Sequence, residues 1–187
     1  MSAVAGRRGA STSRSPLIVA VSGLVGVVSL AGVAVVTANP SGRGTDLTRS
    51  SELSSYVAAI HTPLAQGGQV VVEEMRPALA DVAAGRLSPS QLAARAQSWV
   101  TALSSVKRSF DAIQAPLELS HARGFFDRSL NLYIAVAEEV EIGTAPAVAS
   151  AISTGEKADA MFDQGAAITQ AALRAAGLAP SRTLPNP

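Results

Sequence analysis

The feature that constrains this chain most is a long interval without charge. No residue from Ser15 to Gly42 is charged, and the stretch Leu17–Ala38 contains only apolar and small side chains. As an α-helix, these 22 residues rise about 33 Å, enough to cross a hydrocarbon core about 30 Å thick. Inside a bilayer, a helix satisfies all of its backbone hydrogen bonds internally. We therefore predict a transmembrane signal-anchor helix at residues 16–38.

The flanks of this segment predict its orientation. Residues 1–15 form a basic leader that carries Arg7, Arg8 and Arg14 and no acidic residue. Because an excess of basic charge is retained on the cytoplasmic side of a membrane, we expect the N-terminus in the cytoplasm and everything after Ala38 outside it. Beyond Ala38, 12 Lys and Arg oppose 14 Asp and Glu, a formal charge of −2. A nucleic-acid partner is not expected, since phosphate binding needs a concentrated basic face.

The same segment also has features of a cleavable signal. Val36-Thr37-Ala38 is acceptable as a cleavage site, and cleavage after Ala38 would release a secreted protein. Signal peptides have an apolar stretch of about 7 to 15 residues, and the stretch here is longer. The length favours an uncleaved anchor in the cell membrane, with secretion as the alternative.

The chain contains no cysteine. Disulfides, thiolate-bound metals and lipid attachment through cysteine are therefore excluded, and packing alone must hold the fold. Composition divides the part beyond the apolar segment into a flexible linker at 39–46, a helical bundle at 47–178 and a disordered tail at 179–187. About 130 residues is an ordinary size for one domain.

The second expected helix of the bundle has the clearest signals. Ser88 is placed as an N-cap, Pro89 as the first helical residue and Gln91 as the partner of Ser88 in a capping box. Apolar residues then recur at spacings of 4 and 3 in alternation, which indicates the heptad seam of a packed helix. These residues are Leu92, Ala96, Trp99, Leu103, Val106, Phe110 and Ile113.

Three other segments show helical periodicity. A first helix from about Asp46 to Ala84 contains Pro63, Gly67-Gly68 and Pro77, where we expect bends or a break. A third helix follows Pro116, and its apolar stripe consists of Leu119, Ala122, Phe126, Leu130, Tyr133, Ala137 and Val140. An alanine-rich fourth helix from about Pro146 to Ala176 ends at Gly177, and its larger apolar residues are Val148, Ile152, Met161, Phe162, Ile168 and Leu173. Four such helices with short connections predict an all-α fold, an antiparallel up-down-up-down four-helix bundle.

The sharpest chemical hint is Glu118 followed by His121. Di-iron four-helix bundles use two such Glu-x-x-His pairs together with two further glutamates. Only one pair is present here, because Ala58 stands three residues before the other histidine, His61. His121 also lies about 200° from the core direction on a helical wheel. We therefore interpret Glu118 as complementing a helix N-terminus and His121 as a surface or boundary residue, and we predict no metal site.

Other polar residues have structural interpretations. His61 lies on the flank of an apolar stripe, so we expect a partly buried, hydrogen-bonded histidine, with a pH sensor as the alternative. Glu73-Glu74, Glu138-Glu139 and Glu141 fall on polar helix faces, which favours solvated surface charge over acid and base catalysis. The sequence has no catalytic triad, nucleotide loop or cofactor motif. We predict no catalytic, cofactor-binding or metal-binding residues.

A stripe of small residues runs along the apolar segment. Ser22, Gly26 and Ser29 recur at spacings of 4 and 3. Such a stripe allows two membrane helices to approach closely and pair. Small residues are also common in single spans, so a homodimer and a monomeric anchor both stay open.

The segment Ile113–Ala122 ends an apolar seam, makes a short turn and restarts a helix at Pro116. In this it resembles uncharacterised secreted or single-pass extracytoplasmic helical proteins of high-GC bacteria. The resemblance implies an envelope location and no active-site residue. We therefore expect a membrane-anchored extracytoplasmic bundle with a non-enzymatic interaction or structural role in the cell envelope, contacting an envelope protein or a second copy. The alternative is a ligand-binding or sensory bundle that holds a small molecule or ion near His61 and the bend of the first helix.

Overall fold

A computed structural model describes residues 43–179 of the protein, and every regular element in that range is helical. The first rod is continuous and consists of α1 (Arg43–Gln69), the π-helical turn η1 (Val70–Met75) and α2 (Arg76–Ala83). It is followed by α3 (Pro89–Asp111), the short 3-10 helix η2 (Leu117–Leu119), α4 (Ser120–Glu141) and α5 (Ala145–Ala175). The prediction of an all-α fold is confirmed.

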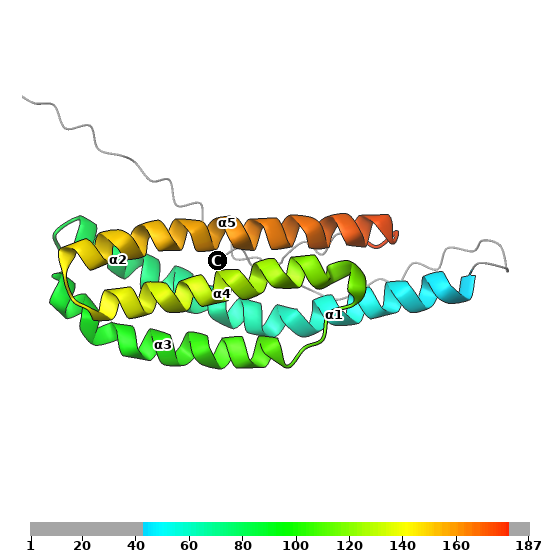
Figure 1. The fold of residues 1–187 in the computed structure, drawn as a ribbon, viewed down its shortest axis with the longest axis horizontal. Coiled ribbons are helices and arrows are strands. Elements are labelled where there is room, and N and C mark those ends of the chain that lie inside the picture. Colours follow the sequence, from blue (N-terminus) through cyan, green and yellow to red (C-terminus); the bar gives the residue numbers. More distant parts are fainter. Residues whose placement is uncertain (1–42, 180–187) are drawn as a thin grey trace, which may run out of the picture. The chain divides into compact units, whose positions relative to one another are not determined.

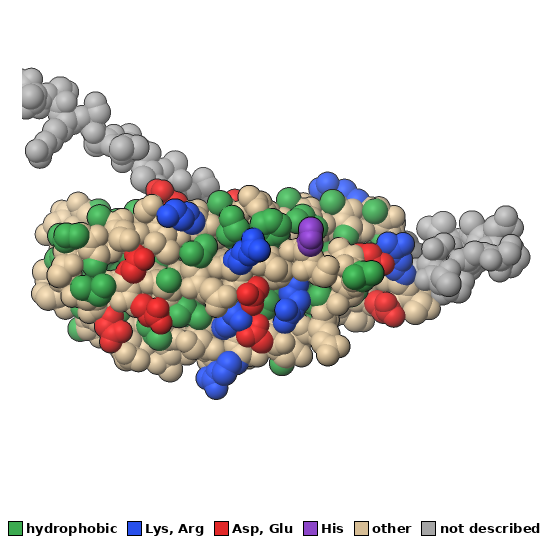
Figure 2. Space-filling view, viewed as in Figure 1, with side chains coloured by type: hydrophobic (Ala, Val, Ile, Leu, Met, Phe, Trp, Pro, Cys, Tyr) green, Lys and Arg blue, Asp and Glu red, His purple; other side chains and the backbone are tan. Residues whose placement is uncertain are grey.

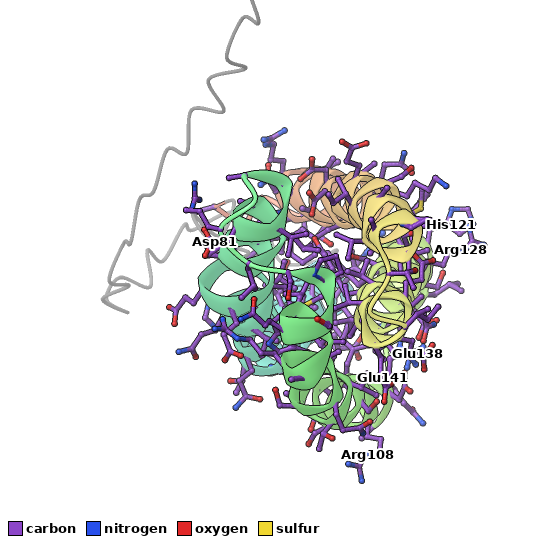
Figure 3. All side chains as sticks on the ribbon, turned by 90° about the vertical axis from the view of Figure 1, so that its left-hand side faces the viewer. Asp81, Arg108, His121, Arg128, Glu138 and Glu141 are labelled. Atoms are coloured by element: carbon purple, nitrogen blue, oxygen red, sulfur yellow. The ribbon has the colours of Figure 1, made fainter. Side chains whose placement is uncertain are left out.

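The four rods lie lengthwise beside one another. Figure 1 shows the chain reversing its direction between the first rod and α3, between α3 and α4, and between α4 and α5. In the view of Figure 3, α4 lies between α3 and α5, and the first rod closes the bundle on the remaining side. Neighbouring rods therefore run in opposite directions around a shared core.

The helix α3 begins at the position that the sequence predicts. Ser88 Oγ accepts a hydrogen bond from the Gln91 N–H at 3.2 Å, and the Gln91 side chain accepts one from the Ser88 N–H at 2.9 Å. Two N–H groups of the first turn thus have partners, as a capping box provides. The predicted start of this helix is confirmed.

Glycines in the left-handed conformation end three of the helices. Gly85, Gly143 and Gly177 follow α2, α4 and α5 with φ values of 70°, 71° and 69°. This conformation, which costs glycine little, turns the chain back so that its N–H groups can bond the last helical carbonyls. The N–H of Leu178 accordingly donates to the carbonyl of Leu173 at 2.9 Å.

The irregularity predicted in the first rod is localised to η1. The Arg76 N–H bonds the carbonyl of Val71, five residues earlier, where an α-helix would use the fourth. Pro77 has no N–H, and its ring crowds the carbonyl four residues before it, so a wider turn ahead of it relieves the crowding. Pro63 lies inside α1 without interrupting it. The expected bend or break is therefore one widened turn in a continuous rod.

Two apolar clusters make up the core. The first joins Met75, Trp99 and Val140, among others, from η1, α3 and α4. The second joins Ile60, Phe110, Phe126 and Phe162, among others, with Phe126 packed edge-on against Phe110 and Phe162 at ring-centroid distances of 6.4 and 5.2 Å. The predicted seam of α3 as far as Phe110 and the whole predicted stripe of α4 are buried.

The α5 residues packed against α4 include both the large Phe162 and the small Gly165. Ile152, one of the larger apolar residues of this helix, is 37% exposed, whereas its neighbour Ala151 is fully buried. At Gly165, an added Cβ would lie 2.9 Å from Cε1 of Phe126 and 3.1 Å from the carbonyl oxygen of Ala122. The two helices are too close there for a larger side chain. Ile152 lies beside the buried stripe of α5, which includes Val148 and Ala151, so its position around the helix leaves it exposed.

Several predicted segments lie outside the described residues: the leader at 1–15, the signal-anchor at 16–38, most of the linker and the tail from 180 onward. Within residues 43–179, no helix has the length and apolar composition needed to span a membrane. Residues 43–46, assigned by composition to the linker, are helical and belong to α1. A helix that has started gains a backbone hydrogen bond with each added residue, which offsets the unfavourable Gly44.

Candidate functional site

A surface hollow of about 230 Å³ lies between the first rod and α3. Most small-molecule pockets are larger, about 300–1,000 Å³, so this one suits a single small group. Three of its side chains are acidic and one is basic. The residues that line this acidic hollow are Glu73, Glu74, Pro77, Ala78, Asp81, Arg95, Ser98 and Trp99.

The widened turn η1 forms one wall of the acidic hollow. Val71 and Met75 hold the turn in the core, and Glu73 and Glu74 between them are exposed. π turns are frequent at functional sites because they alter the spacing of side chains along a helix. The acidic pair that the sequence assigns to the surface is exposed, as predicted, and it stands at the edge of a hollow.

Trp99 forms the floor of the acidic hollow and is bonded to its wall. The side chain is 2% exposed, and its indole Nε1–H donates to Oε2 of Glu74 at 2.9 Å. A tryptophan N–H usually has a partner when the ring is buried, and a carboxylate is a strong acceptor. The bond fixes the direction of the Glu74 side chain and ties η1 to α3.

The other acidic side chains of the hollow bond exposed side chains nearby in the sequence. Glu73 accepts a hydrogen bond from Nε2 of Gln69 at 3.1 Å, on the same exposed face of the first rod. Asp81, labelled in Figure 3, receives two hydrogen bonds from Arg86, from Nε at 2.9 Å and from Nη2 at 2.6 Å. The hollow therefore has one carboxylate neutralised by an ion pair and two that balance only one lining cation, Arg95.

A polar cluster crosses the bundle next to η1. Asp159 on α5 accepts a hydrogen bond from the Tyr133 hydroxyl on α4 and another from Nη2 of Arg76 at 2.7 Å. Burial, together with the hydrogen bond to Asp159, raises the pKa of Tyr133 above its usual value, while the Arg76 charge opposes the shift. The cluster joins α2, α4 and α5 directly after the widened turn.

The hydroxyl of Tyr56 is buried, and the described residues offer it no hydrogen-bond partner. Tyr56 lies on α1 in the second apolar cluster and is 4% exposed. Burial raises the pKa of Tyr56 to about 12, and the charge of Arg123 acts in the opposite direction. No feature of the sequence singles out this tyrosine.

The structure keeps Glu118 and His121 apart from any metal-binding arrangement. Oε1 of Glu118 pairs with Nε of Arg49 at 2.8 Å. His121 is exposed and points outward in Figure 3. Within the described part of the chain, no group of three or more His, Asp or Glu side chains is placed to hold a metal ion.

His61 is exposed, so the prediction of a partly buried histidine is wrong. The buried positions of α1 continue from Ile60 to Pro63 and Leu64, three and four residues further on. A position one residue after Ile60 is turned about 100° away from the core. His61 therefore lies outside the stripe, and it does not line the acidic hollow.

The second acidic cluster lies on the outside of α4. Glu138 and Glu141 are exposed and point outward in Figure 3, and Glu139 accepts a hydrogen bond from the Thr154 hydroxyl at 3.2 Å. On the face shown in Figure 2, acidic and basic side chains are interspersed with apolar ones. These glutamates are surface charge, as predicted.

The residues of the candidate site that sequence reasoning missed are those joined across helices, above all Trp99 with Glu74. Their spacing carries no signal, because the bond depends on how two helices are rotated against each other. No protein-family model, curated protein or solved structure matches the chain. Its function is therefore inferred from its own residues.

Proposed function

We propose that this protein is a membrane-anchored extracytoplasmic helical bundle with a non-enzymatic interaction or structural role in the cell envelope. The observation that carries the proposal is the uncharged stretch Leu17–Ala38, preceded by Arg7, Arg8 and Arg14. Such a stretch is long enough to span a bilayer, and its basic flank favours a cytoplasmic N-terminus. The proposed whole-chain architecture is a transmembrane helix at 16–38 followed by an up-down-up-down four-helix bundle.

Two features of the described bundle support a role in contact with other molecules. Its polar side chains are joined mainly as helix caps, ion pairs and cross-helix bonds such as Trp99 to Glu74. On the face shown in Figure 2, acidic and basic side chains are interspersed with apolar ones, so partners of either charge can approach it. The partner we propose is an envelope protein or a second copy of this chain.

The absence of cysteine makes the topology directly testable. Single substitutions Ser13→Cys and Arg128→Cys place one thiol in the leader and one on the exposed surface of α4. In intact cells, a membrane-impermeant maleimide should label position 128 and spare position 13 until the cells are lysed. Release of a shortened protein into the medium would favour secretion after Ala38. Labelling of position 13 in intact cells would contradict the proposal.

Pairing through the apolar segment has its own test. In-cell crosslinking from Arg128→Cys should recover an envelope protein or a dimer, and recovery of monomer alone would count against an interaction role. Where the product is a dimer, Gly26→Ile places a bulky side chain on the stripe of small residues and should abolish it. Ala34→Ile, elsewhere in the same segment, is the matched control.

A second candidate function, binding of a small molecule or ion, is favoured by the acidic hollow. The site we propose lies at η1 and Trp99, and His61 has no part in it. Since the acidic side chains outnumber the single cation Arg95, a small organic cation suits the lining. Spermidine should raise the melting temperature of the full chain, and Glu73→Gln should weaken this effect while the exposed Glu138→Gln should not. Equal responses in all three proteins would exclude the hollow as the site.

A further inference from the structure

Two leucines are unusually exposed at one end of the bundle. Leu47 on α1 is 70% exposed, and Leu117 at the start of η2 is 87% exposed. Apolar side chains of this size gain free energy when they leave water, and folding has left both of them in it. Burial of both leucines against a partner or a surface would therefore be favourable.

An ion pair holds the two segments that carry these leucines together. Arg49, two residues after Leu47, pairs with Glu118, the residue after Leu117, at 2.8 Å. Figure 1 shows the start of α1 and the connection between α3 and α4 at the same end of the bundle, with α1 extending beyond the end of α5. Leu47 and Leu117 thus belong to one end surface, which we call the leucine end.

The leucine end is also where the chain leaves the described bundle. Arg43 begins α1 only five residues after Ala38, so even an extended chain separates them by no more than about 18 Å. Leu47 follows four residues later, about 6 Å along the helix. The end of the uncharged stretch and the leucine end are therefore close along the chain.

We propose that the leucine end rests on the lipid surface, with Leu47 and Leu117 inserted in the interfacial layer of the bilayer. This inference rests on the proposed membrane tether. Two leucines alone would bind lipid weakly, but a tether of a few residues gives them a high effective concentration at the membrane. The bundle then stands with the α4–α5 connection away from the bilayer.

The test uses the full chain in vesicles of phosphatidylcholine and phosphatidylglycerol. Leu47→Cys, Leu117→Cys and Ile142→Cys are each labelled with an environment-sensitive fluorophore. Ile142, 65% exposed in the α4–α5 connection at the opposite end, is the matched control. At positions 47 and 117, emission should shift to shorter wavelength, doxyl-labelled lipid should quench it, and aqueous iodide should quench it less than at position 142.

Flotation of the same vesicles separates the possible failures. If the protein floats with the vesicles and iodide quenches position 117 as strongly as position 142, the leucine end does not rest on the lipid, and the membrane tether is still supported. If iodide is excluded from positions 47 and 117 but doxyl-labelled lipid does not quench them, a protein surface covers the leucine end. The proposal that it rests on lipid is then wrong. If the protein does not float, the proposed membrane tether is contradicted, and so is the proposed contact of the leucine end with lipid.

Discussion

The indole N–H of Trp99, on a side chain that is 2% exposed, lies 2.9 Å from a carboxylate oxygen of Glu74. This bond joins α3 to the widened turn η1 and aims one carboxylate at the acidic hollow. Trp99 therefore packs in the core and also fixes the position of an exposed carboxylate. Removal of the acceptor would leave a buried donor without a partner.

Glu74→Ala should therefore lower the free energy of unfolding by about 1–3 kcal/mol, the cost of an unsatisfied buried donor. Glu74→Gln should cost less, because an amide oxygen still accepts. Urea unfolding followed by the emission of Trp99, the only tryptophan of the chain, measures both. Glu73→Ala is the matched control, since Glu73 bonds only an exposed side chain of its own rod in the described structure. An equal loss in the two alanine variants would show that the cross-helix bond is unimportant.

Gly165→Ala should destabilise the bundle even though alanine is the better helix former. The new Cβ would lie 2.9 Å from a carbon of Phe126 and 3.1 Å from a backbone oxygen, and overpacking of this kind costs about 1–3 kcal/mol. At Gly155 in the same helix, the nearest atom is 3.9 Å away, so Gly155→Ala should stabilise by up to about 1 kcal/mol. Thermal unfolding of both variants tests the close contact of α4 and α5. Stability changes of opposite sign would support it, and stabilisation of both variants would refute it.

The two tyrosines should respond in opposite ways to loss of their hydroxyls. Tyr56→Phe removes a buried group that has no partner within the described residues, so stability should stay level or rise by about 1 kcal/mol. Tyr133→Phe removes the hydrogen bond to Asp159 and should lower stability by about 1.5–3 kcal/mol, the range for a bond to a charged group. Denaturant unfolding of the two variants measures both changes in stability. A destabilised Tyr56→Phe would reveal a partner for that hydroxyl.

The pKa shifts of the same tyrosines predict the pH range in which alkali destabilises the bundle. Burial raises the pKa of Tyr56 from 10.0 to about 12, and burial with the Asp159 bond raises the pKa of Tyr133. The unfolded chain releases these protons near pH 10 and the folded chain only at higher pH. The stabilising contribution of Tyr56 is therefore intact below pH 10 and is lost as the pH rises from 10 to 12, while the loss of the Tyr133 contribution also begins near pH 10 and continues to higher pH.

Tyrosinate absorbance and helical circular dichroism, recorded together across this range, measure that loss. Ionisation should accompany the loss of helix, because both tyrosines of the chain are buried in the bundle. Ionisation near pH 10 with the helices intact would contradict the burial of both hydroxyls.

Features fixed by neighbours along the chain could be predicted from the sequence. The α3 start depends on Ser88 and Gln91, three residues apart, and its seam depends on a repeat that any helix must place on one face. The same holds for the turn at Gly177. Such signals are complete within one or two helical turns, so no knowledge of the tertiary structure is needed.

Features fixed by contact between helices could not be predicted in this way. Ala151 is buried and the larger Ile152 is exposed because of the way α5 is rotated against its neighbours. Two prolines lie in the first rod, and only Pro77 has a widened turn before it. The acidic hollow depends on the rotation of η1 against α3, which the repeat of either helix leaves open.

The division of the core into two clusters has a mechanical consequence. A force applied through a tether at the start of α1 reaches the cluster around Ile60 and Phe110 first, and the cluster around Met75 and Trp99 only later. Cooperative units with separate contacts can open at different free energies. The cluster around Ile60 and Phe110 is thus the part of the core that a pull on the start of α1 would strain before the acidic hollow.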